Sequence, residues 1–109
     1  MNEIKKLTQK LVEFRDKRDW GKFHNPKDIS IAINLESSEL LENFLWKLPN
    51  EGNIENIKEE LADIFCYSLL LAEFYKIDVN KIILDKIKKN NQKYPVEKAK
   101  GNNKKYTQL

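Results

Sequence analysis

The scarcity of glycine and proline constrains this chain to long stretches of regular structure. Only six of its 109 residues are Gly or Pro, whereas Leu, Ile, Lys and Glu are abundant. Because turn formers are few and helix formers many, we expect an all-α protein. A length of 109 residues corresponds to one domain, so we expect residues 1–109 to form a single unit.

Hydrophobic periodicity predicts four helices. Apolar residues recur at helical spacing over residues 3–18, 26 to about 48, about 54 to 75, and 79 to about 93. Asn25 followed by Pro26 is typical of a helix start, and Asp78 is a suitable N-cap for the fourth helix. The short connections favour an antiparallel four-helix bundle. Residues 96–109 are polar and basic, and we predict no regular structure there.

One segment of the third helix is apolar almost all round. Residues 64–72 read IFCYSLLLA, so we expect this stretch to be buried on several sides, either centrally or at a subunit interface. A chain this short buries only about two-thirds of its unfolded surface, and association would help to stabilise it. A dimer is therefore the smallest unit that we expect.

The charges are unevenly distributed along the sequence. Residues 1–75 carry 10 basic and 14 acidic side chains, whereas residues 76–109 carry 10 basic and 3 acidic ones. An acidic body with a basic C-terminal third is suited to holding a cation and a polyanion side by side. It is also compatible with nucleic-acid binding, or with a solvated terminus that has no partner.

Several classes of protein are excluded. Cys66 is the single cysteine, which excludes a disulfide scaffold. No apolar run reaches the roughly 18 residues of a membrane span, and the N-terminus does not resemble a signal peptide. We therefore expect a cytoplasmic protein with no membrane partner. The glycines Gly21, Gly52 and Gly101 are isolated, so a Walker-type phosphate loop is excluded as well.

Two pairs of acids carry the strongest chemical signal. Glu36 and Glu39 lie three residues apart, as do Glu60 and Asp63 on the next helix, so each pair shares one helix face. Each pair is flanked by apolar residues, and four acids meeting between two helices would repel one another and lose solvation. A divalent cation would remove both costs, and Mg²⁺ prefers oxygen ligands of this kind. The alternative is that these acids form an ordinary solvated helix face.

The blocks around these acids resemble a known family. ESSELLENFLW, from Glu36 to Trp46, and EELAD, from Glu59 to Asp63, resemble the ExxE and ExxD motifs of the MazG-like nucleotide pyrophosphohydrolases, an all-α superfamily. The dCTP pyrophosphatase branch is the most similar. RDWGKFHNP at residues 18–26, the K-x-x-x-N-x-x-x-Y-P block at residues 86–95 and KKYT at residues 104–107 extend the resemblance to about residues 4–109.

The resemblance implies a role for particular residues. Glu36, Glu39, Glu60 and Asp63 match the Mg²⁺ ligands, Lys86, Asn90 and Tyr94 match triphosphate contacts, and Trp20, Trp46 and Tyr67 match aromatic residues that line the base pocket. Mn²⁺ is a possible substitute for Mg²⁺. His24, the single histidine, is interpreted as a pocket or capping residue. Without the resemblance, Trp46 would more naturally be interpreted as a core residue at the end of the second helix. Lys93 departs from the pattern, since relatives often have Arg before Tyr-Pro, and lysine lacks the guanidinium fork.

The residues and the resemblance together predict an Mg²⁺-dependent hydrolase. We expect a nucleoside triphosphate, dCTP or a related pyrimidine deoxynucleotide, to be converted to the monophosphate and pyrophosphate. Glu39 and Glu59 are both candidates to orient or deprotonate the attacking water. The family forms dimers or tetramers, which implies a homodimer or homotetramer with sites near a subunit interface.

A second hypothesis is a non-catalytic helical module that binds nucleotides or nucleic acid through the basic C-terminal third. Steep salt dependence would identify nucleic-acid binding, whereas catalysis should depend on magnesium. We favour the enzyme and do not expect nucleic acid as a partner.

Overall fold

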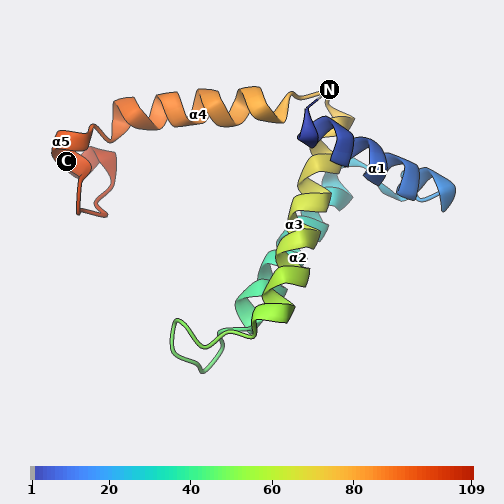
Figure 1. The fold of residues 1–109 in the computed structure, drawn as a ribbon, viewed down its shortest axis with the longest axis horizontal. Coiled ribbons are helices and arrows are strands. Elements are labelled where there is room, and N and C mark those ends of the chain that lie inside the picture. Colours follow the sequence, from blue (N-terminus) through green and yellow to red (C-terminus); the bar gives the residue numbers. More distant parts are fainter. Residues whose placement is uncertain (1) are drawn as a thin grey trace. The chain divides into compact units, whose positions relative to one another are not determined.

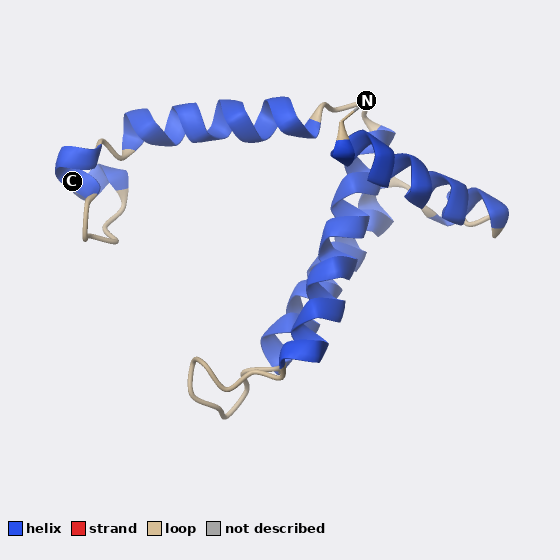
Figure 2. Ribbon diagram, in the orientation of Figure 1, coloured by secondary structure: helices blue, strands red, loops and turns tan. Residues whose placement is uncertain are grey.

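Helices are the only regular structure in the computed structural model, which describes residues 2–109 (Figure 2). No strand occurs among these described residues, so the prediction of an all-α protein is confirmed. The chain divides into two units, the first ending at Ile77 and the second covering Asp78–Leu109. The first unit contains α1 (Glu3–Lys17), the 3₁₀ helix η1 (Gly21–Phe23), α2 (Pro26–Glu42) and α3 (Ile54–Phe74); the second contains α4 (Val79–Lys93), α5 (Val96–Ala99) and the 3₁₀ helix η2 (Tyr106–Gln108).

A side-chain cap begins each of the four long helices. In every case a short polar side chain accepts a hydrogen bond from the backbone N–H three residues later, which satisfies a donor that the helix itself leaves free. The caps are Asn2 for α1, Asn25 for α2, Asn53 for α3 and Asp78 for α4. The predicted starts at Asn25-Pro26 and at Asp78 are therefore confirmed.

The first unit is built on the pairing of α2 with α3. Figure 1 shows these two helices side by side, joined at one end by a loop, with α1 lying against α3 near the other end. The buried core of this unit is small and consists of Ile29 on α2 with Leu70 and Ala72 on α3. The pairing brings the two acidic motifs onto facing helices.

The end of α2 differs from the prediction. The helix ends at Glu42, not near Leu48. Beyond it, the backbone N–H groups of Asn43, Phe44 and Leu45 donate to the carbonyl three residues back, which tightens the chain into 3₁₀-type turns. The Asn43 side chain also donates to backbone carbonyls of the last turn. Trp46 then adopts a left-handed φ of 61°, a conformation that ends helices.

The apolar stretch of α3 is less covered than expected. Only Leu70 and Ala72 within it are buried, and the side chain of Phe65 is 60% exposed. Burial on several sides within one chain is therefore wrong. The other expectation, burial at a subunit interface, stays a prediction.

In the second unit, α4 covers the residues predicted for the fourth helix. The following segment is more regular than expected, because it forms α5 and η2. Since α4 belongs to the second unit, the four-helix bundle remains a prediction. Among residues 2–109, no helix has the length and apolar character needed to cross a membrane.

Candidate functional site

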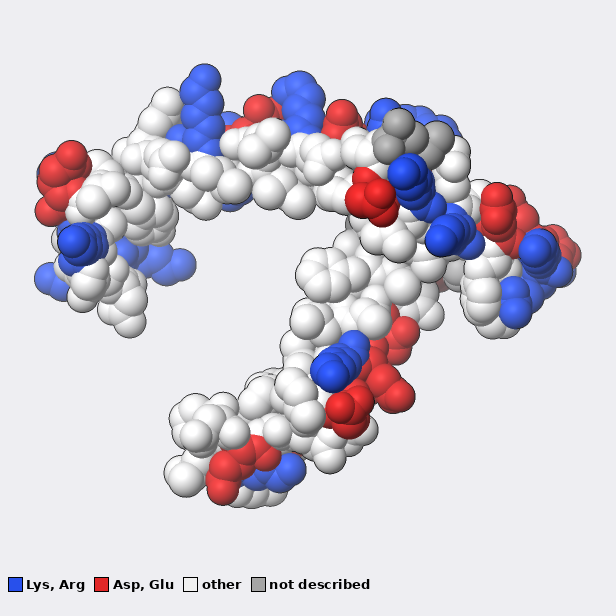
Figure 3. All heavy atoms as spheres, in the orientation of Figure 1, with Lys and Arg blue, Asp and Glu red and all other residues white. Residues whose placement is uncertain are grey.

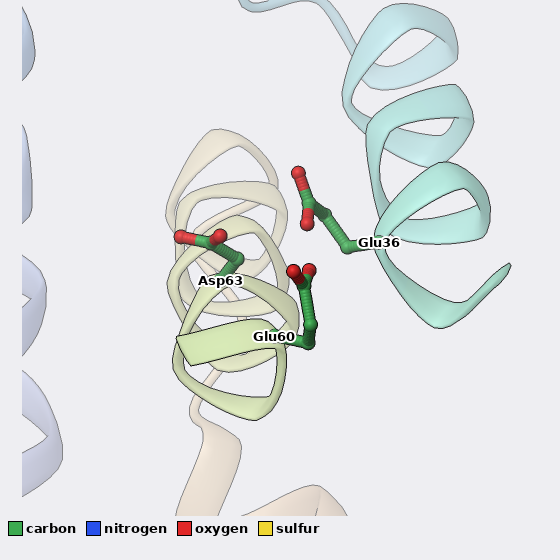
Figure 4. Close-up of side chains that lie close together, drawn as sticks. All are labelled: Glu36, Glu60 and Asp63. Atoms are coloured by element: carbon green, nitrogen blue, oxygen red, sulfur yellow. The ribbon is translucent and has the colours of Figure 1, made fainter. Parts of the chain in front are cut away.

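Three carboxylates meet between α2 and α3. Glu36 projects from α2 towards α3, where Glu60 and Asp63 lie one turn apart (Figure 4). Each side chain offers one oxygen, and these oxygens all lie within 4.8 Å of one another. Opposite ligands of an octahedral Mg²⁺ are about 4 Å apart, so small side-chain adjustments would bring the three onto one ion.

The local structure explains why these acids converge. Glu60 and Asp63 share one face of α3 because Asp63 lies three positions after Glu60. The pairing of α2 with α3 turns this face towards Glu36. On the face that Figure 3 shows, acidic side chains gather along the same helix pair.

Two of the carboxylate oxygens are buried without a partner. Neither Oε2 of Glu36 nor Oε2 of Glu60 accepts a hydrogen bond from any described residue. Burying an unpaired carboxylate is costly, and a bound cation is one of the few arrangements that compensates for it. The all-oxygen donor set and these unpartnered atoms fit a hard divalent cation such as Mg²⁺.

The electrostatics of the cluster favour the same interpretation. Burial raises the pKa of Glu36 to about 7, and the acidic groups around it add to the increase. For Glu60, the contact with Glu36 lowers the pKa, but Glu39, burial and the neighbouring charges outweigh it, so the net direction is upwards. Like charges held together resist ionisation. Binding of a cation to this cluster would therefore be accompanied by release of protons from its carboxyl groups.

Glu39 and Glu59, the two candidate general bases, lie outside this group of three. Glu39 is exposed on α2, and its carboxyl is close enough to raise the pKa of both Glu36 and Glu60. It is nevertheless outside the set of three converging oxygens. Glu59 is exposed on α3 and is also outside that set. Both glutamates therefore stay candidates for the general base that accepts a proton from the attacking water.

Tyr67 borders the carboxylate cluster, and His24 packs against Tyr67. Their rings meet edge to face with centroids 6.3 Å apart. The pKa of Tyr67 is raised by burial and by the negative charges of Glu36 and Asp63. Burial, followed by the charge of Arg15, lowers the pKa of His24, and its Nδ1 is buried without a partner. Sequence reasoning missed Arg15, because nothing in its local pattern shows that α1 brings it towards His24.

The two tryptophans are in different surroundings. Trp20 packs edge to face on Phe14, with centroids 5.8 Å apart, and remains partly exposed. Trp46 is 100% exposed, so the alternative that it is a core residue is wrong for this chain. The structure does not bring Trp46 together with the other residues that are expected to line the nucleobase pocket.

The expected triphosphate contacts lie in the second unit. Lys86 and Asn90 are exposed on α4, and Tyr94 is the residue that ends that helix. Their spacing of four residues places them along one side of the helix. Their approach to the carboxylates stays a prediction.

Comparison with known proteins identifies the family. Residues 31–109 match the family model described as MazG-like, which is well over half of the sequence. The chain belongs to the MazG-like family. This confirms the resemblance read from the ExxE and ExxD motifs, which lie within the matched region.

Two curated proteins are also similar to this chain. It is 34% identical over 106 residues to dCTP pyrophosphatase 1 of Mus musculus, covering 90% of this chain and 62% of the relative. The identity with dCTP pyrophosphatase 1 of Bos taurus is 35% over 106 residues, covering 90% and 63%. The chain thus spans somewhat less than two-thirds of the length of these curated relatives.

A crystal structure of a pyrophosphatase from Archaeoglobus fulgidus has a similar fold. The two structures superpose with a TM-score of 0.79 and share 34% sequence identity. The match covers 87% of this chain and 94% of the archaeal one. The chain therefore shares its fold with a pyrophosphatase of known structure.

Proposed function

We propose that this protein is a nucleoside triphosphate pyrophosphohydrolase. Its substrate is dCTP or a related pyrimidine deoxynucleotide, and its products are the nucleoside monophosphate and pyrophosphate. The observation that carries the proposal is the cluster of Glu36, Glu60 and Asp63, with two buried oxygens that lack partners. The similarity to dCTP pyrophosphatases supports the choice of substrate.

The carboxylate cluster is the part of the site that would hold Mg²⁺, with Mn²⁺ as a substitute. Glu36, Glu60 and Asp63 would supply three oxygens, and Glu39, whose carboxyl contributes to the raised pKa of Glu36, would supply a fourth. When bound, the cation neutralises charge on the triphosphate and so makes phosphorus accessible to water.

The remaining residues bind and orient the substrate. Glu39 or Glu59 accepts the proton of the attacking water. Lys86, Asn90 and Tyr94 hold the triphosphate, and the lysine charge offsets the negative charge that develops on leaving pyrophosphate. Trp20, His24 and Tyr67 form the surroundings of the nucleobase, where aromatic faces stack on it.

The protein acts as a homodimer or homotetramer in this proposal. Large apolar side chains on α3, among them Leu61, Phe65 and Phe74, are exposed in the single chain. Exposed apolar surface of this kind commonly marks an interface between proteins. The family match runs across the boundary between the two units, which supports one MazG-like domain over residues 1–109.

A substrate panel tests the proposal. The purified protein is incubated with Mg²⁺ and each of the common ribo- and deoxyribonucleoside triphosphates, and kcat/KM is determined for each. We expect a deoxypyrimidine triphosphate to give the highest value and a chelator to abolish turnover. Absence of turnover with all of them, together with salt-sensitive binding to DNA, would favour the non-catalytic module instead.

A further inference from the structure

The C-terminal segment folds back onto the end of α4. After α5, the chain passes through Gly101, whose φ of 74° lies in the left-handed region that glycine adopts without strain. A side-chain hydrogen bond from the Lys104 N–H to Asn102 Oδ1 continues the turn at 2.9 Å. Figure 1 shows the C-terminus beside α5, next to the last turn of α4.

Tyr106 is the contact between this segment and α4. Its ring meets the ring of Tyr94 edge to face, with centroids 6.0 Å apart and an angle of 81°. The ammonium of Lys93 lies 4.9 Å from the centroid of the same ring. One aromatic side chain therefore contacts the last residue of α4 and the residue that caps it.

These two contacts lie at the C-terminal end of α4, where an anionic ligand requires a positive charge to bind. The C-terminal end of a helix carries partial negative charge, which disfavours phosphate. Lys93 is the basic residue in the last turn of α4, and Tyr94 continues the row formed by Lys86 and Asn90. A free lysine side chain loses conformational entropy when it binds, and a cation–π contact that already restricts it reduces this loss.

We propose that Tyr106 is a positioning residue for triphosphate binding. It restrains the Lys93 ammonium and the Tyr94 ring so that both are ordered at the end of α4 before the ligand arrives. The inference rests on the proposed function, because that function supplies the triphosphate that Lys86, Asn90 and Tyr94 bind. It adds a residue from the C-terminal segment, together with Lys93, to the groups that determine affinity.

The test compares Tyr106→Leu with Tyr106→Phe in the full-length chain. Binding of inorganic tripolyphosphate in the presence of Mg²⁺ is measured by calorimetry, and kcat and KM are measured with dCTP. We expect Tyr106→Leu to weaken tripolyphosphate binding about 3- to 10-fold, the range that loss of an aromatic and a cation–π contact implies. KM should rise by a similar factor while kcat stays within about twofold. Tyr106→Phe, which keeps the ring, should restore both values.

Gln108→Ala is the matched control, since Gln108 lies in the same 3₁₀ helix with an exposed side chain. Unchanged tripolyphosphate affinity in Tyr106→Leu would overturn the inference, as would absence of binding by the wild type or failure of Tyr106→Phe to restore it. Tripolyphosphate binding does not require hydrolysis. If no nucleotide is turned over, the proposed function fails, but the calorimetric comparison still decides the role of Tyr106.

Discussion

At the scale of single residues, Glu36 is the side chain on which the account most depends. Its Oε2 is buried without a hydrogen-bond partner, and it faces two acids from the opposite helix. In the absence of metal this arrangement destabilises the fold, because like charges are held close together and one oxygen of Glu36 is buried without a partner. In the presence of metal the same arrangement becomes a binding site. Removing the Glu36 charge should therefore stabilise the metal-free fold and weaken the binding of metal.

We predict that Glu36→Gln lowers the rate of Mg²⁺-dependent hydrolysis about a hundredfold or more, since even the outer-shell partners of metal ligands contribute about 10- to 100-fold. Without metal at pH 8, the variant should melt at the same temperature as the wild type or higher. Thermal melts with and without Mg²⁺ measure this, and Mg²⁺ should no longer raise the Tm. Glu42→Gln, at an exposed position of α2, is the control. Wild-type activity in Glu36→Gln would refute the assignment.

The pKa of Glu36 predicts how stability depends on pH. The pKa is about 7 in the folded chain and 4.5 in the unfolded chain. Between these values the folded state keeps a proton that the unfolded state releases, so the contribution of Glu36 to stability is lost as pH rises from about 4.5 to 7. We expect the Tm of the metal-free wild type, relative to Glu36→Gln, to fall over this interval. Parallel curves for the two proteins would show that the pKa is unshifted.

At the scale of elements, the helix starts were predictable and one helix end was not. A start depends on a short polar side chain three residues before the N–H that it caps, as for Asn25 and Asp78, and that pattern is local in sequence. The end of α2 depends on Asn43 donating to carbonyls of the preceding turn. Hydrophobic periodicity continues past this residue to Leu48 and so predicts too long a helix.

The cap of α3 supports the helix that carries two of the three acids. We predict that Asn53→Ala lowers the free energy of unfolding by about 1 kcal/mol, because the side chain accepts from the Asn56 N–H at 3.1 Å. Chemical denaturation measures the loss. Asn50→Ala, in the same loop, should change stability by less than about 0.5 kcal/mol, the usual range for a surface substitution away from a cap. Equal losses in both variants would contradict the role of the cap.

The candidate site was predictable in part. The two acid pairs are visible in the sequence, and the packing of α2 on α3 places Glu36, Glu60 and Asp63 together. The sequence does not show that Glu39 lies outside this group of three, because this depends on the rotation of α2 about its axis. It also does not show the pairing of His24 with Tyr67, since that contact joins residues far apart along the chain.

At the scale of the whole molecule, exposed apolar surface is the dominant feature. Few of the described residues are buried, whereas Phe65 on α3 and Leu84 on α4 are among many large apolar residues that remain exposed. Chains of this length gain stability from association. Self-association would therefore cover surface that the single chain leaves in water.

We predict that the wild type sediments as a dimer or tetramer and that Phe65→Glu weakens association by roughly tenfold or more, the effect typical of a central interface residue. Analytical ultracentrifugation over a concentration series measures both. Asn56→Glu adds the same charge at an exposed position of the same helix and should leave the assembly intact. A wild type that sediments as a monomer at all concentrations would contradict the prediction.

The reaction products provide the most direct test of the central claim. Phosphorus NMR of dCTP incubated with the protein and Mg²⁺ distinguishes pyrophosphate from orthophosphate in a single spectrum. We expect dCMP and pyrophosphate in equal amounts, formed only while Mg²⁺ is present and about a hundredfold or more slowly by Glu36→Gln. Formation of dCDP and orthophosphate, or turnover that survives chelation of the metal, would contradict it.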